Sequence, residues 1–167
     1  MYRLAPETAD DLYEVENLFD LAFAPGREAL SSYRLREAVA PVGDLCLVAR
    51  DQNQVLGGAI RYWPVAIGDQ LHKALLLGPV AVHPTCQGEG VGGVLIRDSL
   101  AKARNLGWQR VVLIGDAPYY QRFGFIPVAG LEFPPPTNPE RLLGLELTDG
   151  AFDAVTGLVR KWPQAQA

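Results

Sequence analysis

The residues with the clearest chemical potential form a glycine-rich segment in the middle of the chain. Gly88-Glu89-Gly90-Val91-Gly92-Gly93 follows the apolar run from Leu75 to Val82 and a short connection, His83 to Gln87. Glycines let backbone N–H groups approach a ligand closely, and the start of a helix adds a partial positive charge. An apolar strand that runs through glycines into a helix therefore predicts an anion cradle, and we expect a phosphate-bearing ligand there.

The residues after the glycines have the pattern of an amphipathic helix that Gly107 ends. Small and apolar residues fall on one face at helical spacing: Gly92, Leu95, Ile96, Ser99, Leu100, Ala103 and Leu106. The apolar segment from Arg110 to Gly115 then predicts a buried strand. Strand, anion loop, helix and strand together form a βαβ unit.

The glycine spacing also satisfies the dinucleotide-binding fingerprint. Gly88-x-Gly90-x-x-Gly93 fits its pattern, and Asp116 ends the next predicted strand, where a ribose-binding acid is expected. In that fold the first glycine follows the strand directly, whereas the residues from His83 to Gln87 intervene here. The chain also predicts only one parallel crossover, so an NAD(P)-binding oxidoreductase is the weaker alternative.

Two sequence blocks resemble the GNAT N-acetyltransferase superfamily. Gln87-Gly88-Glu89-Gly90-Val91-Gly92 is similar to its Gln/Arg-x-x-Gly-x-Gly/Ala loop, and Val80-Ala81-Val82-His83-Pro84 precedes the loop in the usual position. Tyr119-Tyr120-Gln121-Arg122-Phe123-Gly124-Phe125 is similar to the family's aromatic-Tyr-x-x-x-Gly-Phe segment. Two blocks in the right order are more specific than either glycine pattern alone. The chain is most similar to the bacterial branch of predicted N-acetyltransferases without an assigned acceptor.

The resemblance implies that acetyl-CoA is the acetyl donor and that the main chain binds it. The pyrophosphate would lie on the loop amides, and the pantetheine arm would bond to the preceding strand as though it were another strand. The residues implied are Val80, Ala81, Val82, Gln87, Gly88, Glu89, Gly90, Val91 and Gly92. Pro79 removes an N–H just before this stretch, which is consistent with a strand that bulges and opens a slot.

By the same resemblance, Tyr120 matches the family tyrosine that protonates the departing CoA thiolate. A phenol with a pKa of about 10 is a weaker acid than a thiol of about 8.5, so hydrogen bonding to the developing charge on sulfur suffices. The alternative is that Tyr120 is a core aromatic beside Phe123 and Phe125. We expect loss of its hydroxyl to be costly but not to abolish activity.

The general base is unassigned. Several family members carry a glutamate on the strand before the loop, but Leu75-Leu76-Leu77-Gly78-Pro79 contains none. Asp116, Glu132 and Asp69 are candidates by position only. His72 and His83 are too isolated to form a metal site, so no metal is expected.

The whole chain, residues 1–167, predicts a single GNAT domain of the α+β (α/β/α) class, with a mixed, mostly antiparallel central sheet flanked by helices. A first helix is capped by Thr8 and buries one stripe: Leu12, Val15, Leu18, Phe19 and Phe23. A second helix follows, with Leu30, Leu35 and Val39 inward. This second helix spans Arg27–Val39, and a proline-rich loop spans Phe133–Pro139. The other predicted strands are Tyr2–Ala5, Leu45–Arg50, Val55–Ile67, Phe125–Val128 and Leu142–Leu147. A bulge is predicted at Gly57-Gly58, within the Val55–Ile67 strand.

Composition limits the partners. A formal net charge of −4 over 167 residues gives no basic field for nucleic acid or an anionic membrane. The apolar window from Ala74 to Val82 is far shorter than the ~20 residues that span a bilayer. Only Cys46 and Cys86 are present, and the N-terminus lacks an apolar signal core, so we expect a cytoplasmic protein.

Function is therefore predicted as transfer of an acetyl group from acetyl-CoA to a primary amine by direct attack in a ternary complex. A small-molecule or peptide amine is the expected acceptor, bound among the first two helices, the Val55–Ile67 strand and the proline-rich loop. A homodimer is left open. The remaining alternative is a non-catalytic CoA-binding module that keeps the cradle without efficient transfer.

Overall fold

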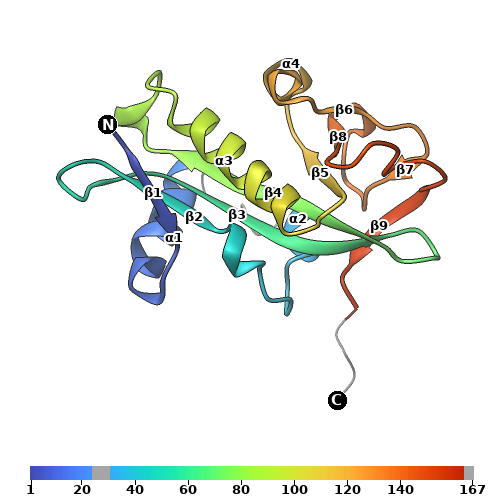
Figure 1. Cartoon of the computed structure of the whole chain (residues 1–167). Helices are drawn as coiled ribbons and strands as arrows, with labels where there is room; N and C mark the ends of the chain where they lie inside the picture. Colours follow the sequence, from blue (N-terminus) through green and yellow to red (C-terminus); the bar gives the residue numbers. More distant parts are fainter. Residues whose placement is uncertain (24–30, 164–167) are drawn as a thin grey trace.

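The computed structural model describes residues 1–23 and 31–163, and one mixed sheet forms its centre (Figure 1). Along the sheet the strands follow the order β1-β2-β3-β4-β5-β8-β6, and β9 pairs with β3 and β7. The strands are β1 (Arg3–Pro6), β2 (Leu47–Arg50), β3 (Leu56–Ile67), β4 (His72–Val82), β5 (Arg110–Ile114), β6 (Ile126–Pro127), β7 (Leu131–Glu132), β8 (Leu142–Glu146) and β9 (Gly157–Lys161). Only β4–β5 and β7–β9 are parallel among the described pairs, which confirms the predicted mixed, mostly antiparallel sheet.

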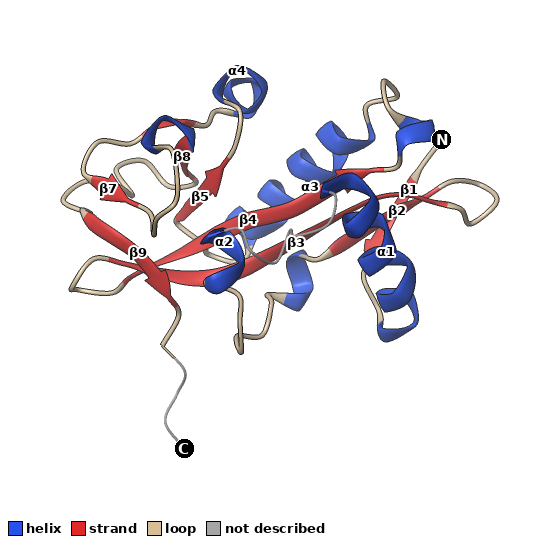
Figure 2. Ribbon diagram, turned by 180° about the vertical axis from the view of Figure 1, so that it is seen from behind, coloured by secondary structure: helices blue, strands red, loops and turns tan. Residues whose placement is uncertain are grey.

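Helices cover both faces of this sheet (Figures 1 and 2). Helix α3 (Val91–Asn105) lies on one face, and α1 (Leu12–Phe23) and α2 (Ser31–Arg34) lie on the other, while α4 (Ala117–Tyr120) follows the end of β5. The alternation of side chains along β4 produces the two faces, because Leu75 and Leu77 pack in the α3 cluster whereas Leu76 packs on the opposite face. The α/β/α layering predicted from the sequence is confirmed.

Strand β4 bulges where the sequence places Pro79. Val80 pairs with Ile60 of β3 but Leu77 pairs with Tyr62, so β4 carries one extra residue between these pairs. On its other edge β4 pairs with β5 only at Leu75 and Leu76. Within the described chain, no strand therefore covers that edge of β4 from Leu77 onward, as the predicted slot requires.

The predicted bulge at Gly57-Gly58 is also present. Ala49 of β2 pairs with Gly58, but Arg50 pairs with Leu56, which leaves Gly57 as the extra residue. A Cβ on Gly57 would collide with the ring of Tyr2, and one on Gly58 would lie 2.8 Å from Val91 of α3. Glycine is therefore needed here for close packing of the N-terminus and α3 on β3.

Three residues predicted to be buried are exposed. Leu12, Phe23 and Leu106 have exposed fractions of 52%, 40% and 50%. Leu12 and Phe23 are the first and last residues of α1, and Leu106 directly follows α3, so all three lie at the margin of the face that packs on the sheet. The central residues of the α1 stripe, Val15, Leu18 and Phe19, are buried as predicted.

The second predicted helix is shorter than expected. Of its described residues, only Ser31–Arg34 form α2, and the chain turns through Ala38, whose φ of +59° cannot continue a helix. Leu35 and Val39 are buried as predicted, whereas Arg27 to Leu30 lie outside the described residues.

Several strand predictions were also incomplete. A 3₁₀ turn occupies Gly43–Leu45, so β2 begins at Leu47, and β6 is confined to Ile126–Pro127. Strands β7 and β9 were not predicted. They exist because β9 pairs with the far end of β3 and with β7, which are contacts between segments remote in sequence.

Candidate functional site

A cleft of about 540 Å³ lies between the open edge of β4, the glycine-rich loop, the start of α3 and the segment that contains Tyr120. Its lining contains every predicted cofactor-binding residue except Glu89. The lining residues are Val80, Ala81, Val82, Cys86, Gln87, Gly88, Gly90, Val91, Gly92, Gly93, Arg97, Tyr119, Tyr120, Arg122 and Phe123. We call it the CoA cleft, after the ligand that the sequence predicts.

The loop wall of the CoA cleft is built from backbone. Gly88 and Gly90 have φ values of +86° and +80°, and a Cβ on either would meet nothing within 4 Å. The first intrahelical bond of α3 runs from the Val94 N–H to the Gly90 carbonyl at 3.1 Å. Amides of the first helical turn therefore lack helical acceptors and are available to an anion. This arrangement leaves the backbone at Gly88 and Gly90 open to an anion such as a pyrophosphate.

Glu89 anchors the loop from outside the cleft. Its carboxylate accepts a hydrogen bond from the Tyr2 hydroxyl at 2.6 Å, and its own N–H donates to the Cys86 carbonyl at 3.4 Å. The side chain of Glu89 is therefore directed to the N-terminal segment. Earlier in the loop, His83 Nδ1 bonds to the Thr85 hydroxyl at 2.8 Å and accepts the Thr85 N–H, a structural role.

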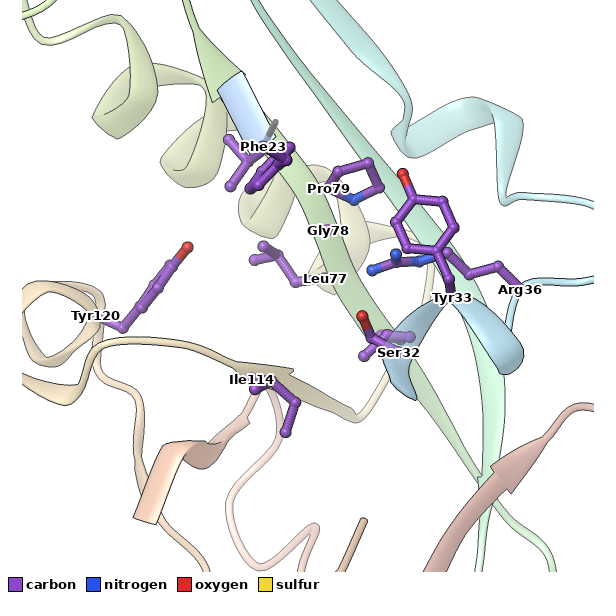
Figure 3. A pocket seen from close by; sticks show the side chains of 11 residues that line it. Phe23, Ser32, Tyr33, Arg36, Leu77, Gly78, Pro79, Ile114 and Tyr120 are labelled. Carbon is purple, nitrogen blue, oxygen red and sulfur yellow. The ribbon is translucent and has the colours of Figure 1, made fainter. Parts of the chain in front are cut away.

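Tyr120 lies where the CoA cleft meets a second cavity. Its ring packs edge-on against Tyr119 and Phe125, with centroids 5.0 and 6.0 Å away. A Cβ on Gly115 would collide with the Tyr120 ring, so that glycine makes room for it. The hydroxyl points away from α4 toward β4 (Figure 3). Tyr120 is therefore packed among aromatic residues, as the alternative prediction of a core aromatic stated, but its hydroxyl faces the two cavities.

Burial is the main cause that raises the pKa of Tyr120, to about 12, and the negative charges that Tyr119 and Asp116 can carry add to it. The phenol therefore stays protonated over the physiological pH range. It can donate a hydrogen bond, but it is a weaker acid than a free tyrosine.

Two arginines line the CoA cleft beside its aromatic residues. The Arg97 guanidinium lies 5.0 Å from the Phe123 ring centroid, and that of Arg122 lies 4.7 Å from the Tyr119 centroid. Neither arginine is among the cofactor-binding residues that the sequence predicts. The position of Arg97 one turn after Gly93 is the signal that could have identified it.

The second cavity, which we call the acceptor pocket, has a volume of about 130 Å³ and lies between α2, β4, β5 and α4 (Figure 3). Val80 and Tyr120 line both this pocket and the CoA cleft. Its lining comprises Phe23, Ser32, Tyr33, Arg36, Leu76, Leu77, Gly78, Pro79, Val80, Ile114 and Tyr120. The exposed Phe23 therefore lines a cavity, and its ring centroid lies 6.4 Å from that of the buried Phe19.

A third cavity, the outer pocket, adjoins the acceptor pocket and has a volume of about 340 Å³. The two share Tyr33, Arg36 and Pro79. The other lining residues are Glu16, Glu37, Arg61 and Trp63. No described residue that lines either pocket comes from the proline-rich loop, which the sequence analysis had included in the acceptor region.

Among the described residues that line the CoA cleft and the acceptor pocket, none is an aspartate or glutamate. Asp116 and Glu132 are exposed outside both, and Asp69 pairs with Arg160 at 2.7 Å. The three positional candidates for a base therefore line neither cavity.

In residues 1–23 and 31–163, no group of three or more His, Cys, Asp or Glu side chains is arranged to hold a metal ion. No helix in these ranges is both long and apolar enough to cross a bilayer.

A family model described as the acetyltransferase (GNAT) domain matches residues 43–127, about half of the chain. The chain belongs to the GNAT acetyltransferase family. The matched range runs from the turn before β2 to β6 and includes the glycine-rich loop and Tyr120. A GNAT enzyme is an acetyl-CoA-dependent acyltransferase, and the oxidoreductase alternative finds no support.

Relatives and solved structures agree with this assignment. The uncharacterized N-acetyltransferase YjhQ of Escherichia coli is 37% identical over 124 residues, which cover 73% of this chain and 66% of that protein. The crystal structure of the Escherichia coli GNAT protein YhbS in complex with CoA superposes with a TM-score of 0.85 at 27% identity, over 96% of this chain and 89% of YhbS. A GNAT acetyltransferase from Brucella melitensis in complex with acetyl-CoA gives a TM-score of 0.74 at 31% identity, over 96% and 95% of the two chains.

Proposed function

We propose that this chain transfers the acetyl group of acetyl-CoA to a primary amine by direct attack, with the thioester in the CoA cleft and the amine in the acceptor pocket. The single observation that carries the proposal is that Val80 and Tyr120 line both cavities. A thioester beside Val80 would then be reached by an amine from one side while its sulfur faces the phenol from the other.

The open edge of β4 supports the placement of the pantetheine arm. Successive peptide groups of a strand point to opposite edges, so about half of the N–H and C=O groups from Leu77 to Val82 face the gap left by β5. These groups can bond to the amides of the arm. One N–H among Val80, Ala81 and Val82 would donate to the thioester oxygen as it gains negative charge.

In the chemical step the amine nitrogen bonds to the acetyl carbon and the carbon–sulfur bond breaks. Tyr120 donates a hydrogen bond to the departing sulfur, which then takes a proton. The amine loses one proton as the new bond forms, and the CoA sulfur gains one, so the protons balance over the reaction. The products are the N-acetylated acceptor and free CoA.

The experiment measures thiol release from acetyl-CoA with a panel of amines, together with CoA affinity. Tyr120→Phe should lower kcat by roughly 100-fold or more, the range of general acid catalysis, and leave CoA affinity within about twofold. Tyr13→Phe is the matched control, because Tyr13 is exposed on α1 outside the cavities, and it should behave as wild type.

Two results would oppose the proposal. Equal activity of Tyr120→Phe and wild type on an accepted amine would remove Tyr120 from the mechanism. CoA binding without thiol release for any amine would favour the non-catalytic CoA-binding module.

A further inference from the structure

The outer pocket leads into a further cavity, which we call the far pocket. The far pocket has a volume of about 380 Å³ and shares Glu16, Arg61 and Trp63 with the outer pocket. Its other lining residues are Glu7, Thr8, Ala9, Leu12, Pro41, Gly43 and Cys46. The acceptor pocket, the outer pocket and the far pocket therefore form one groove, which begins beside Val80 and Tyr120.

This groove crosses the sheet from β4 to the end of β1. A row of paired residues links the four strands: Pro6, Leu47, Ile60 and Val80. One residue further along, the Glu7 N–H donates to the Cys46 carbonyl at 2.8 Å, and Arg61 lies opposite the β4 bulge. Neighbouring strands lie about 4.8 Å apart, so the groove extends about 14 Å over these strands. That length matches about four residues of an extended peptide, at about 3.3 Å per residue.

The charges along the groove favour an occupant with few cations. The Arg61 guanidinium donates to the Glu7 carboxylate at 2.8 Å and to the Glu16 carboxylate at 3.0 Å. Glu37 is the third carboxylate among the described lining residues, and it is exposed. A polyamine would bring several cations to a groove in which two of three carboxylates already bind arginine. An uncharged peptide body needs no such carboxylates.

A polar group of Trp63 also favours a peptide. Trp63 lines both the outer pocket and the far pocket, and its Nε1 atom is buried without a hydrogen-bond acceptor among the described residues. An indole nitrogen can only donate, and a buried donor without an acceptor is destabilising. A peptide supplies a carbonyl acceptor at every residue, whereas a polyamine supplies none.

The acidity of the amine distinguishes an N-terminus from an alkylamine. Among the described residues that line the CoA cleft and the acceptor pocket, none is an aspartate, glutamate or histidine. An amine that arrives already neutral therefore has an advantage. An α-amino group with a pKa of about 7.8 is neutral in about one molecule in seven at pH 7, whereas an alkylamine with a pKa of about 10.4 is neutral in about one in 2,500.

We propose that the acceptor is the N-terminal α-amino group of an extended peptide, whose first residue enters the acceptor pocket and whose next residues follow the groove to the far pocket. This inference rests on the proposed acetyl transfer and assigns the substrate class of that reaction. Leu12 and Gly43, which line the far pocket, then contact the peptide about four residues from its amine.

The first experiment varies only the length of the peptide. Alaninamide and the amidated peptides of two, three, four and six alanines all carry an α-amino group, and thiol release gives kcat/KM for each. Wild-type kcat/KM should rise by roughly 10- to 100-fold from alaninamide to tetraalaninamide, because contacts remote from the amine also stabilise the transition state. Hexaalaninamide should gain little more, since its last residues extend beyond the groove.

The second experiment blocks the far pocket. A Cβ on Gly43 would meet nothing within 4 Å, and Gly43 has no positive φ, so Gly43→Phe adds a ring to the far pocket without backbone strain. The ratio of kcat/KM for tetraalaninamide to that for dialaninamide should fall by roughly fivefold or more. Ala101→Phe is the matched control, because it adds the same ring on the exposed side of α3, and it should keep the wild-type ratio.

CoA affinity of Gly43→Phe reports whether that variant is folded. If it is not, the reaction products acetylalaninamide and acetyl-tetraalaninamide are compared as inhibitors of the wild-type enzyme. The longer product should inhibit more strongly, because it occupies the whole groove.

Equal kcat/KM at every peptide length, an unchanged ratio in folded Gly43→Phe or equal inhibition by the two products would overturn this proposal and leave acetyl transfer standing. Spermidine or Nα-acetyllysinamide used better than tetraalaninamide would do the same, in favour of a polyamine or a lysine side chain. Thiol release with none of these amines, despite CoA binding, would instead count against the proposed function as a whole.

Discussion

The two sides of the β4 bulge are built in different ways. The CoA cleft presents main chain at Gly88, Gly90 and the first turn of α3 on one wall, and side chains from α3 and the Tyr119–Phe123 segment on the other. The acceptor pocket presents side chains from α1, α2, β4, β5 and α4. Both sides share Val80 and Tyr120, where the reaction is proposed to take place.

This difference separates what is common to the family from what is particular to the chain. A diphosphate and a pantetheine arm are the same for every enzyme that uses CoA, so peptide groups can recognise them. An acceptor differs between enzymes, so its recognition depends on side chains. Substitutions on the two sides should therefore change different measured constants, which the following predictions test.

The largest effect is expected on CoA affinity, from a substitution in the backbone wall of the CoA cleft. Gly90→Val forces a β-branched residue to a φ of +80° in the anion cradle, and CoA affinity should fall by roughly 100-fold in titration calorimetry. Gly107→Val imposes a φ of +93° after α3, outside the cleft, and neither glycine has an atom within 4 Å of its ideal Cβ. The control should lose stability but keep its CoA affinity. Equal losses of affinity in both variants would show that strain alone, and not the cradle, accounts for the effect.

A smaller effect is expected at the shared residue Tyr120, in the pH dependence of stability. Because burial raises its pKa from 10.0 to about 12, the folded state holds the phenolic proton more tightly than the unfolded state. The resulting stabilisation is complete below about pH 10 and is lost as the pH rises through about 12. At about pH 11 the loss amounts to about 1.4 kcal/mol.

Urea unfolding at about pH 9 and about pH 11 measures this difference. Tyr120→Phe lacks the proton, so its free energy of unfolding should fall less than that of wild type by about this amount. Parallel pH dependences of the two proteins would show that Tyr120 is solvated in the folded state.

The smallest effect is expected at the outer anchor of the loop. Tyr2→Phe removes the hydrogen bond to Glu89, which lies outside the cleft, and CoA affinity should fall by roughly two- to threefold because the loop is less well held. Tyr13→Phe serves again as the control. A loss as large as that of Gly90→Val would mean that the loop, rather than the helix start, contributes most of the binding.

Local sequence patterns predicted the secondary-structure elements around the CoA cleft well. The apolar strand, the glycines, the α3 stripe and Gly107 act over neighbouring residues, and the structure has each of them apart from the exposed Leu106. Pro79 predicted the bulge because a missing N–H disrupts pairing wherever the strand lies. The helix ends were predicted less well, since Leu12 and Phe23 have helical spacing but are 52% and 40% exposed at the two ends of α1.

The acceptor side depended on contacts that no local pattern contains. Arg36 carries no signal in the sequence, and only the packing of the segment after α2 against the bulge places it near Gly78. Strand β9 likewise exists through its pairing with β3 and β7.

The sequence by itself determined the family and the fold class, and it predicted the anion cradle and the tyrosine, because these depend on backbone conformation and spacing over short stretches. The tertiary structure alone decided which side chains surround the acceptor pocket, because that pocket forms where α1, α2, β4, β5 and α4 meet, and these elements are remote from one another in the sequence. Glycine and proline change the conformation of their own backbone wherever they lie. The surroundings of a pocket-lining side chain, by contrast, depend on which segments the fold brings next to it.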